Sequence, residues 1–478
     1  MSASAPPVFD VIVLGAGPSG GAAALEAASL GLRVLLLDEN PAAGGQVWRA
    51  PAPELTVTPP PAGDEMRQAL ACSDVDVRPL RRVWSVERHD AGFRVFSDGP
   101  GGTERHDAHA LIVAAGARER IVPVEGWTLP GVIGLAGATV LLKSQKMLPG
   151  RRVVVAGAGP LLALTAILIL EGGGEVAAVV DSNGAGAWLS RTPAMMSRPG
   201  LAARGAGWLA RLAAAGAPIL TRSRVMRVLG ASAAEGVAVA RLDASGRVRS
   251  DAGERIIACD AVCLGDGLAP STEITRLLGC AHAYRPDDGG WTVEADPCGR
   301  TDVPGLYVCG DGAGIRGVDA APLRGRAAAR AVAADRRPQD ADLRRRLDAA
   351  ARGAGKAGRF GRAMSALTAP RPQAYADIDP ATVVCRCEGV TRARIDAAMT
   401  GGALSLNQIK SETRCGMGPC GARFCSDATA ALLAAHLGQD MGDIPLSAAR
   451  PPLRPVALAS LAADFDYDAL PIPAPAPL

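Results

Sequence analysis

Short apolar runs, glycine-rich turns and helical stretches recur in the same order along the first two thirds of the chain. Residues 9–14 form a β-branched run typical of a buried parallel strand, and a glycine-rich turn, an Ala-rich helical stretch and a second strand over 33–37 follow it. The order repeats later, where strands over 151–156 and 175–180 flank another glycine-rich turn and an apolar helix. This repeat predicts an α/β fold with two nested Rossmann-like dinucleotide-binding domains.

The first turn has the residues that a dinucleotide site needs. It contains Gly15, Gly17, Pro18 and Gly20. The first glycine permits the tight turn, the second lets the backbone approach a pyrophosphate, and the third permits close packing of the helix. Asp38 ends the second strand, where a carboxylate accepts hydrogen bonds from a ribose, and Glu39 is its close rival. A turn without a ligand is the alternative, but the complete order of flanking elements favours a nucleotide site.

The second turn departs from this pattern at one position. Gly157 and Gly159 are present, but Leu162 stands where close contact between helix and strand normally requires glycine. Asp181 ends the following strand without an adjacent arginine, which disfavours a nucleotide with a 2′-phosphate. NAD, a nonredox adenine nucleotide and an empty, vestigial fold are all compatible with the sequence.

Five of the eleven cysteines gather near the C-terminal end, at Cys385, Cys387, Cys415, Cys420 and Cys425. Helices predicted over 407–413 and 426–437 leave these cysteines on loops at helix ends, where backbone N–H groups favour anionic sulfur. Four thiolates can hold a [2Fe–2S] cluster or a structural zinc ion. The Cys-x-Cys spacing of the first pair is tighter than zinc sites favour. The pattern therefore points to an iron–sulfur cluster, with zinc and no metal as the alternatives.

Composition and charge narrow the function further. The 478 residues predict about three domains, and a net charge of +3 with only 3% aromatic residues argues against a nucleic-acid partner. The longest strongly apolar run, over 161–170, is too short to span a membrane, and the N-terminus lacks the features of a signal peptide. We therefore expect a cytoplasmic protein without a transmembrane segment. No Cys-x-x-Cys occurs before residue 336 and the five histidines lie outside the motifs, so no residue is a candidate for catalysis.

Three further motifs carry a resemblance to known flavoproteins. They are Gly44-Gly45-Gln46, the strand and turn over 111–116 that end in Ala115-Gly116, and Gly310-Asp311 within the strand and turn over 305–312. These motifs resemble those of two-dinucleotide-binding flavoproteins of the thioredoxin reductase and glutathione reductase kind. The resemblance implies that the first domain binds FAD, with Asp311 at the ribityl and pyrophosphate groups and with Gly45 and Gln46 near the flavin.

The cysteine segment resembles the small [2Fe–2S] domain named after bacterioferritin-associated ferredoxin. In that domain a Cys-x-Cys pair and a later second pair bind the cluster, which implies Cys385, Cys387, Cys415 and Cys420 as the ligands here. This sequence departs from the pattern, because four residues separate Cys415 from Cys420 and a further cysteine, Cys425, follows. The fourth ligand is therefore either Cys420 or Cys425.

Along nearly its full length the chain resembles the A or α flavoprotein subunits of bacterial heteromeric amine-oxidising dehydrogenases, such as opine oxidase, hydroxyproline and proline dehydrogenases and hydrogen cyanide synthase. The two glycine-rich turns, CRCEGVT at 385–391 and TRCGMGPCGARFC at 413–425 carry this resemblance. It implies an electron-transfer subunit with FAD and a [2Fe–2S] cluster, in some members with FMN at a subunit interface. The partners that it implies are a D-amino-acid-oxidase-like flavoprotein, which oxidises the C–N bond, and a small ferredoxin-like subunit.

These expectations divide the chain into five parts. They are an FAD-binding domain over 1–126 and 269–335, an inserted second nucleotide-binding domain over 127–268, a helical linker over 336–380, a small helical [2Fe–2S] domain over 381–440 and a Pro-rich tail over 441–478. The tail is either disordered or extended along a partner. Two other functions stay open: a self-sufficient NAD(P)H-dependent reductase that passes electrons to a ferredoxin-like acceptor, and a noncatalytic docking protein.

Overall fold

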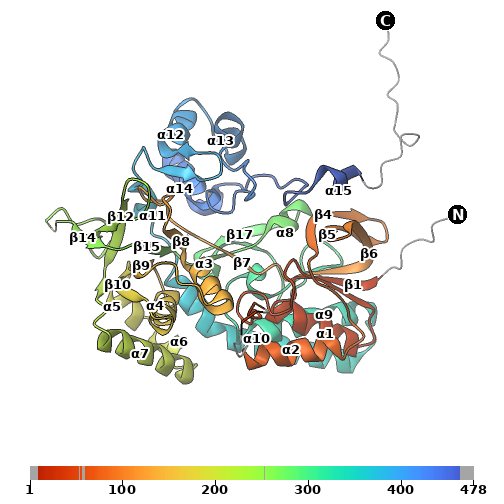
Figure 1. Ribbon diagram of the computed structural model, residues 1–478. Helices are drawn as coiled ribbons and strands as arrows, with labels where there is room; N and C mark the ends of the chain where they lie inside the picture. Colours follow the sequence, from red (N-terminus) through yellow and green to blue (C-terminus); the bar gives the residue numbers. More distant parts are fainter. Residues whose placement is uncertain (1–8, 53, 56–59, 252, 463–478) are drawn as a thin grey trace, which may run out of the picture.

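Figure 1 shows two α/β domains side by side in the computed structural model, with a small helical domain across one end of both. The structure describes residues 9–52, 54–55, 60–251 and 253–462. The predictions for the N-terminus and for the last part of the tail fall on 1–8 and 463–478, which lie outside the described residues. Within the described ranges, no helix is both long enough and apolar enough to cross a membrane.

The first domain is built on a sheet of seven strands. In order across the sheet they are β3 (Asp76–Arg78), β2 (Val34–Leu37), β1 (Phe9–Leu14), β6 (Gly102–Val113), β5 (Gly92–Gly99) and β4 (Arg82–His89), with β19 (Leu306–Val308) paired to the end of β6. Strands β3, β2, β1, β6 and β19 run parallel, whereas β4 and β5 form an antiparallel extension. Parallel strands end at one edge of a sheet. The glycine turn, Asp38, Gly116 and Asp311 therefore converge at that edge.

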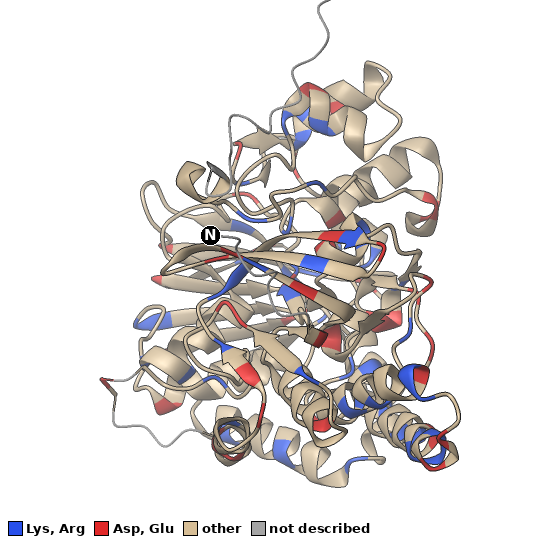
Figure 2. Ribbon diagram, turned by 90° about the vertical axis from the view of Figure 1, so that its right-hand side faces the viewer, with Lys and Arg blue, Asp and Glu red and all other residues tan. Residues whose placement is uncertain are grey.

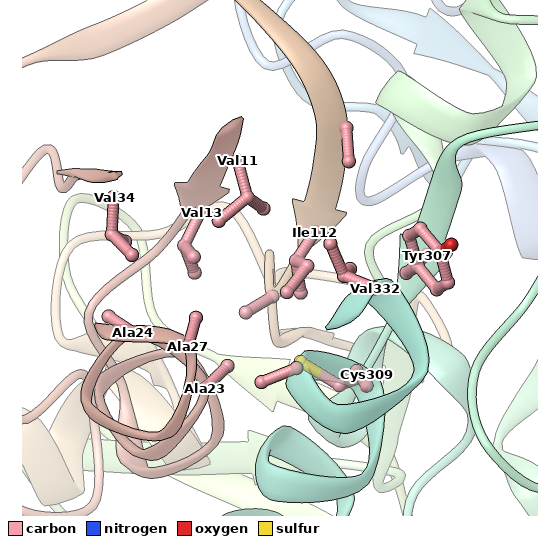
Figure 3. Packing of buried hydrophobic residues seen from close by; sticks show 14 of the residues in the cluster. Val11, Val13, Ala23, Ala24, Ala27, Val34, Ile112, Tyr307, Cys309 and Val332 are labelled. Carbon is pink, nitrogen blue, oxygen red and sulfur yellow. The ribbon is translucent and has the colours of Figure 1, made fainter. Parts of the chain in front are cut away.

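Two helices, α1 (Pro18–Ser29) and α9 (Ala321–Arg336), pack against each other beside this sheet. A Cβ atom at Gly325 in α9 would overlap the backbone oxygen of Ser19, so the two helices approach more closely than a larger residue would permit. Figure 3 shows the small side chains between the helices and the strands, among them Val11, Ala23, Ala27, Ile112 and Val332. This packing holds the N-terminus of α1 at the carboxyl edge of the strands.

The inserted domain repeats this architecture. Its parallel sheet has the order β11 (Ile219–Thr221), β10 (Glu175–Asp181), β9 (Arg152–Gly157), β15 (Ala261–Gly265) and β8 (Val132–Gly134). One face packs against α3 (Leu135–Val140), α4 (Leu161–Glu171) and α7 (Pro199–Ala214). The other face packs against an antiparallel sheet of β12 (Ser223–Leu229), β13 (Gly236–Arg241) and β14 (Arg255–Ala258). The predicted strand, turn, helix and strand over 151–180 are confirmed as β9, its turn, α4 and β10.

Two short antiparallel strands, β7 (Ala117–Glu119) and β16 (Leu268–Pro270), carry the chain into and out of the inserted domain. The Glu119 carboxylate accepts a hydrogen bond of 2.5 Å from the backbone N–H of Ala136, in the first turn of α3. Burial raises the pKa of Glu119 to about 7, although the N–H groups at this helix end favour its charged form. A buried carboxylate thus ties the crossing strand to the second domain.

The segment expected as a linker is largely one long helix, α10 (Ala341–Ala366). The Asp340 carboxylate caps its N-terminus by accepting a hydrogen bond of 2.9 Å from the N–H of Leu343. Leu343 and Leu347, near the start of α10, belong to the core of the first domain. Met364, near its end, packs against the inserted domain. Helix α10 therefore links the two α/β domains by packing as well as by connectivity.

The small domain contains β20 (Val383–Cys385), β21 (Val390–Thr391), α12 (Arg392–Thr400), α13 (Leu406–Thr413) and α14 (Ser426–Leu437). Helix α14 has the predicted bounds, and α13 begins one residue earlier than predicted. The apolar core of the small domain also includes Val122, from the segment that enters the inserted domain, and Tyr375 and Ile378, which precede β20. The small domain thus shares its core with the segments that connect it to the rest of the chain.

The described part of the tail lies against the antiparallel extension of the first domain. The N–H of Leu453 donates to the carbonyl of Trp84 at 2.7 Å, and the Ser460 hydroxyl donates to the Asp98 carboxylate at 2.7 Å. On the face shown in Figure 2, basic and acidic residues are interspersed rather than segregated. That face therefore carries no concentration of one sign of charge.

Candidate functional site

The turn between β1 and α1 is shaped by contacts that leave no room for side chains. Gly15 has a φ of +99°, and a Cβ atom there would lie 2.5 Å from the carbonyl oxygen of Ala114. A Cβ atom on Gly20 would overlap the carbonyl oxygen of Gly15. The space beside Gly17 is open apart from the Cα of Gly45, 3.8 Å away. The turn therefore presents bare backbone at the N-terminus of α1, where a pyrophosphate binds in this kind of fold.

The loop that contains Gly45 contacts this turn. Gly45 has a φ of +57°, and its Cβ atom would lie 2.9 Å from the Cα of Gly17. Gln46, next to it, is exposed and accepts a hydrogen bond of 3.4 Å from Arg49. The Ser19 hydroxyl is buried, and within the described residues it has no hydrogen-bond partner. A buried polar group without a partner in the protein is consistent with a ligand at this place.

The loop after β19 lies against the end of β6. A Cβ atom on Gly312 would lie 3.4 Å from the carbonyl oxygen of Gly116, so Ala115-Gly116 and Gly310-Asp311 are neighbours. The Asp311 carboxylate accepts hydrogen bonds of 3.0 and 3.3 Å from the backbone N–H groups of Arg316 and Gly317. These bonds fix the direction of the carboxylate. The structure thus brings the residues expected around FAD to one edge of the first sheet.

An arginine that the sequence did not single out is hydrogen-bonded to the backbone of this loop. Arg324 of α9 donates hydrogen bonds of 2.7, 2.7 and 2.8 Å to the carbonyl oxygens of Gly310, Ala313 and Gly314. Burial lowers the pKa of Arg324. Its guanidinium compensates three carbonyls that would otherwise be poorly satisfied in a tight loop. The sequence offers no signal for this role, because Arg324 is one of many arginines.

The acid at the end of β2 is turned toward the protein. Asp38 is buried, and its carboxylate accepts a hydrogen bond of 2.5 Å from the N–H of Ala16 in the glycine turn. The backbone and side-chain N–H groups of Asn40 donate to it at 2.7 and 2.8 Å. A carboxylate can accept about four hydrogen bonds, so Asp38 retains capacity for a ribose hydroxyl. Glu39 is exposed beside it.

The corresponding residues of the second domain also lie at one sheet edge. A Cβ atom on Gly157 would overlap the carbonyl oxygen of Gly265, so the turn packs closely on β15. Asp181 is buried and accepts hydrogen bonds of 2.9 Å from the N–H of Asn183 and 3.0 Å from the indole N–H of Trp188. Leu162, which replaces the third glycine, is part of the domain core. Asp181 is thus bonded within the chain much as Asp38 is, and Leu162 fills the place of the third glycine.

The five C-terminal cysteines gather at the N-terminus of α14. The sulfur atoms of Cys385, Cys415 and Cys425 all lie within 4.8 Å of one another and are buried. Cys387 is exposed, and its pKa is raised by partial burial and by the neighbouring Cys420 sulfur. All eleven cysteines are free of disulfides. The chain therefore offers an inner group of three sulfurs and an outer pair, which is enough for a four-thiolate cluster.

The inner group of sulfurs favours the thiolate form of Cys385. The thiols of Cys415 and Cys425 donate to Cys385 and lower its pKa to about 2. The Thr429 hydroxyl lies 3.4 Å from the sulfur of Cys415. Metal ligation requires deprotonated sulfur, so a shared thiolate in a buried pocket suits iron binding.

A largely buried ion pair, with side chains 16% and 15% exposed, connects the cysteine domain to the first domain. The Arg118 guanidinium, two residues after Gly116, donates to the Asp427 carboxylate at 2.8 Å and to the carbonyl of Arg423 at 2.5 Å. Although burial alone would raise it, the pKa of Asp427 is held below its usual value by Arg118 and Arg120. A second pair, between Arg423 and Glu273, measures 2.9 Å. The loop beside the expected flavin is thus bonded to the helix that starts after Cys425.

Comparisons with known proteins identify the families that the two parts of the chain match. The family described as pyridine nucleotide-disulphide oxidoreductase matches residues 9–336, and the BFD-like [2Fe-2S] binding domain matches residues 383–435. The A-subunit of opine oxidase from Agrobacterium tumefaciens is 34% identical over 95% of this chain and 91% of its own length. The HcnB protein of hydrogen cyanide synthase from Pseudomonas protegens is 33% identical over 87% of this chain and 89% of its own length.

Among solved structures, L-proline dehydrogenase from P. horikoshii covers 96% of this chain and 80% of its own, with a TM-score of 0.70 and 20% identity. This likeness shows a shared fold. The predicted fold class, the resemblance to amine-oxidising dehydrogenase subunits and the prediction of an FAD-dependent oxidoreductase are confirmed. The chain belongs to the pyridine nucleotide-disulphide oxidoreductase family and carries a BFD-like [2Fe–2S] binding domain after its two nucleotide-binding folds.

Proposed function

We propose that this chain is the FAD- and [2Fe–2S]-containing electron-transfer subunit of a heteromeric dehydrogenase for amines or amino acids, of the opine, hydroxyproline or glycine type. A D-amino-acid-oxidase-like partner oxidises the C–N bond of the substrate and delivers the electrons to this chain. FMN at a subunit interface and a small ferredoxin-like protein belong to the same proposal. Relatives of this chain are named as subunits of opine oxidase and of hydrogen cyanide synthase, which supports a heteromeric assembly.

The observation that carries this proposal is the buried connection between the two cofactor domains. Arg118 follows the Ala115-Gly116 turn, and Asp427 follows Cys425, so their 2.8 Å bond joins the two sites through a few residues on each side. When bound, FAD takes up two electrons and releases them singly, whereas a [2Fe–2S] cluster carries one. The contribution of the chain is to hold both sites at a constant separation and to exclude water from the contact between them.

Within this proposal the domain over 1–126 and 269–335 holds FAD, the domain over 381–440 holds the cluster, and 127–268 is the insert. The FAD site consists of Gly15, Gly17, Pro18, Gly20, Asp38, Glu39, Gly45, Gln46, Ala115, Gly116, Gly310 and Asp311. The bare glycine turn, the buried Ser19 hydroxyl and the fixed Asp311 carboxylate fit the phosphates and the ribityl chain of this cofactor. His106, which lies outside these sites, has a structural partner in Glu104 at 3.2 Å.

We assign the cluster to two pairs of sulfurs. Cys387 and Cys420 form the outer pair, and Cys385 forms the inner pair together with either Cys415 or Cys425. The sequence left the choice of the fourth ligand between Cys420 and Cys425, and the grouping of the sulfurs moves this choice to Cys415 or Cys425. The inner group has three sulfurs within 4.8 Å, so one of them is spare in a four-ligand cluster. The set with Cys415 is the one that the family resemblance implies, and Cys425 has the same proximity to Cys385.

The runner-up function is a self-sufficient NAD(P)H-dependent reductase. It requires the second domain to bind a nicotinamide dinucleotide near FAD. In this domain the methyl group of Thr368 lies against Gly159 of the glycine turn, where a pyrophosphate would approach, which favours the electron-transfer subunit over this alternative.

The Gly45 loop gives a test of the FAD site. We expect the substitution Gly45→Ala to lower the FAD content of the purified chain by about tenfold, because the added Cβ atom would press on Gly17 and distort the turn. Gly31→Ala is the matched control, since Gly31 also has a positive φ, of +78°, but has open space around it. Equal FAD content in both variants, measured by absorbance after release from the protein, would contradict this site.

The cysteine assignment predicts a pattern among serine variants. The double variant Cys415→Ser/Cys425→Ser should lose the cluster, whereas at least one of the two single variants should keep it, because one inner sulfur is spare. Iron content and the electron paramagnetic resonance signal of the reduced protein report the outcome, with Cys72→Ser, at an exposed and distant cysteine, as control. Loss of the cluster in both single variants, or its survival in the double variant, is incompatible with the assignment.

The proposed role as an electron-transfer subunit is tested by identifying which donors can reduce the protein. Purified full-length protein, loaded with FAD and iron, is titrated anaerobically with NADH, then NADPH, then dithionite, and followed by visible absorbance. We expect neither nicotinamide to bleach the flavin band and dithionite to bleach both the flavin and the iron–sulfur bands. Rapid bleaching by NADH or NADPH would instead establish the self-sufficient reductase.

A further inference from the structure

The end of helix α10 lies on the glycine turn of the second nucleotide-binding fold. Gly159 has a φ of +91°, and a Cβ atom there would overlap the methyl group of Thr368. In a dinucleotide-binding fold this glycine exposes its backbone so that the pyrophosphate can approach the helix N-terminus. Here the side chain of Thr368 already fills the space beside the turn.

Thr368 is held from the opposite side as well. A Cβ atom on Gly267 would overlap the Thr368 hydroxyl, and that hydroxyl donates to the carbonyl of Ser365 at 2.8 Å. The Arg120 guanidinium lies 3.5 Å from the Thr368 carbonyl. Thr368 therefore lies between the turn after β9, which contains Gly159, and the turn after β15, which contains Gly267.

The acid at the ribose position of the same fold is connected to the end of α10 through Asn183. The Asn183 side chain donates to the carbonyl of Leu367 at 2.9 Å and to the Asp181 carboxylate at 3.2 Å. The Trp188 indole donates to the other carboxylate oxygen. The acid that would accept hydrogen bonds from a ribose thus anchors a network that ends on α10.

The end of α10 also makes apolar contacts with the inserted domain. Met364 and Leu367 are 6% and 5% exposed, and together with Ala363 they pack against Ala187 and Trp188. These contacts come from α5 (Ala185–Leu189), the helix that follows β10 and the acid at its end. The segment 363–368 therefore fills the pyrophosphate position and is bonded and packed against the residues around the acid of the same fold.

We infer that the second nucleotide-binding fold of this chain takes no dinucleotide or adenine nucleotide, and that it serves as a socket for residues 363–368. The socket anchors the end of α10 just before the segment whose Tyr375 and Ile378 enter the core of the small domain. The insert then helps to position the cluster domain instead of presenting a hydride donor. This inference does not depend on which partner reduces the protein.

Nucleotide binding to the wild-type protein is the first test. Full-length protein, saturated with FAD so that the first site is filled, is titrated calorimetrically with ATP and separately with NAD⁺ at up to about 1 mM. We expect no saturable heat from either nucleotide. Binding of one equivalent of ATP or NAD⁺ overturns the inference.

The packing of the segment is tested by hydrogen exchange. The substitution Leu367→Asp should accelerate exchange of the amides over 363–368 by about tenfold, because it places a charge in the apolar contact with Trp188. Leu189→Asp is the matched control, since Leu189 is 71% exposed beside the same indole, and it should leave these amides unchanged. Equal exchange in L367D and the wild type overturns the inference.

The wild-type protein decides the question if L367D does not fold. Amides over 363–368 that are protected like those of the core helices support the socket. Amides that exchange as fast as an unstructured peptide overturn it, because an open segment would leave the nucleotide positions free.

Discussion

The largely buried ion pair between Arg118 and Asp427 joins two parts of the chain that are 309 residues apart. Removing both charges from water is costly, so such a pair holds only when its remaining hydrogen-bonding groups are also satisfied. Arg118 meets this condition with the Arg423 carbonyl, and Arg120 lies 4.0 Å from the same carboxylate. Removal of one partner would leave a largely desolvated charge with weaker compensation, which would destabilise this contact. The placement of the cysteine domain against the flavin domain depends on this geometry.

Two further contacts act in the same direction. The indole N–H of Trp127 donates to the carbonyl of Val383 at 2.6 Å, which ties the inserted domain to β20, and the Arg386 guanidinium lies 5.8 Å from the centroid of that indole ring. The end of α10 packs into the insert just before the chain enters the small domain. The cysteine domain is therefore held by the first domain, by the insert and by its own connection. Such an arrangement suits a protein whose task is to keep two redox sites at a constant separation.

The local pattern of the sequence predicted the two βαβ units because each combines a β-branched run, a glycine turn and an acid within a few dozen residues. Gly15, Gly20 and Gly157 behave as those patterns require, since each one's Cβ atom would strike a backbone oxygen. Long-range partners could not be predicted in this way. Nothing in one sequence pairs Arg118 with Asp427, or Thr368 with Gly159, because their proximity arises only from the packing of whole domains. The third inner sulfur, Cys425, was visible as an extra cysteine, but its distance from Cys385 was not.

The central claim is that the flavin and the cluster form one electron-transfer unit within this chain. Its most direct test is flash photoreduction of the anaerobic, fully loaded protein with a deazaflavin, followed by time-resolved absorbance and by electron paramagnetic resonance of frozen samples. We predict that electrons placed on the flavin move to the cluster at a rate that does not change with protein concentration. A flavin that stays reduced beside an oxidised cluster, or a transfer rate proportional to protein concentration, would contradict the claim.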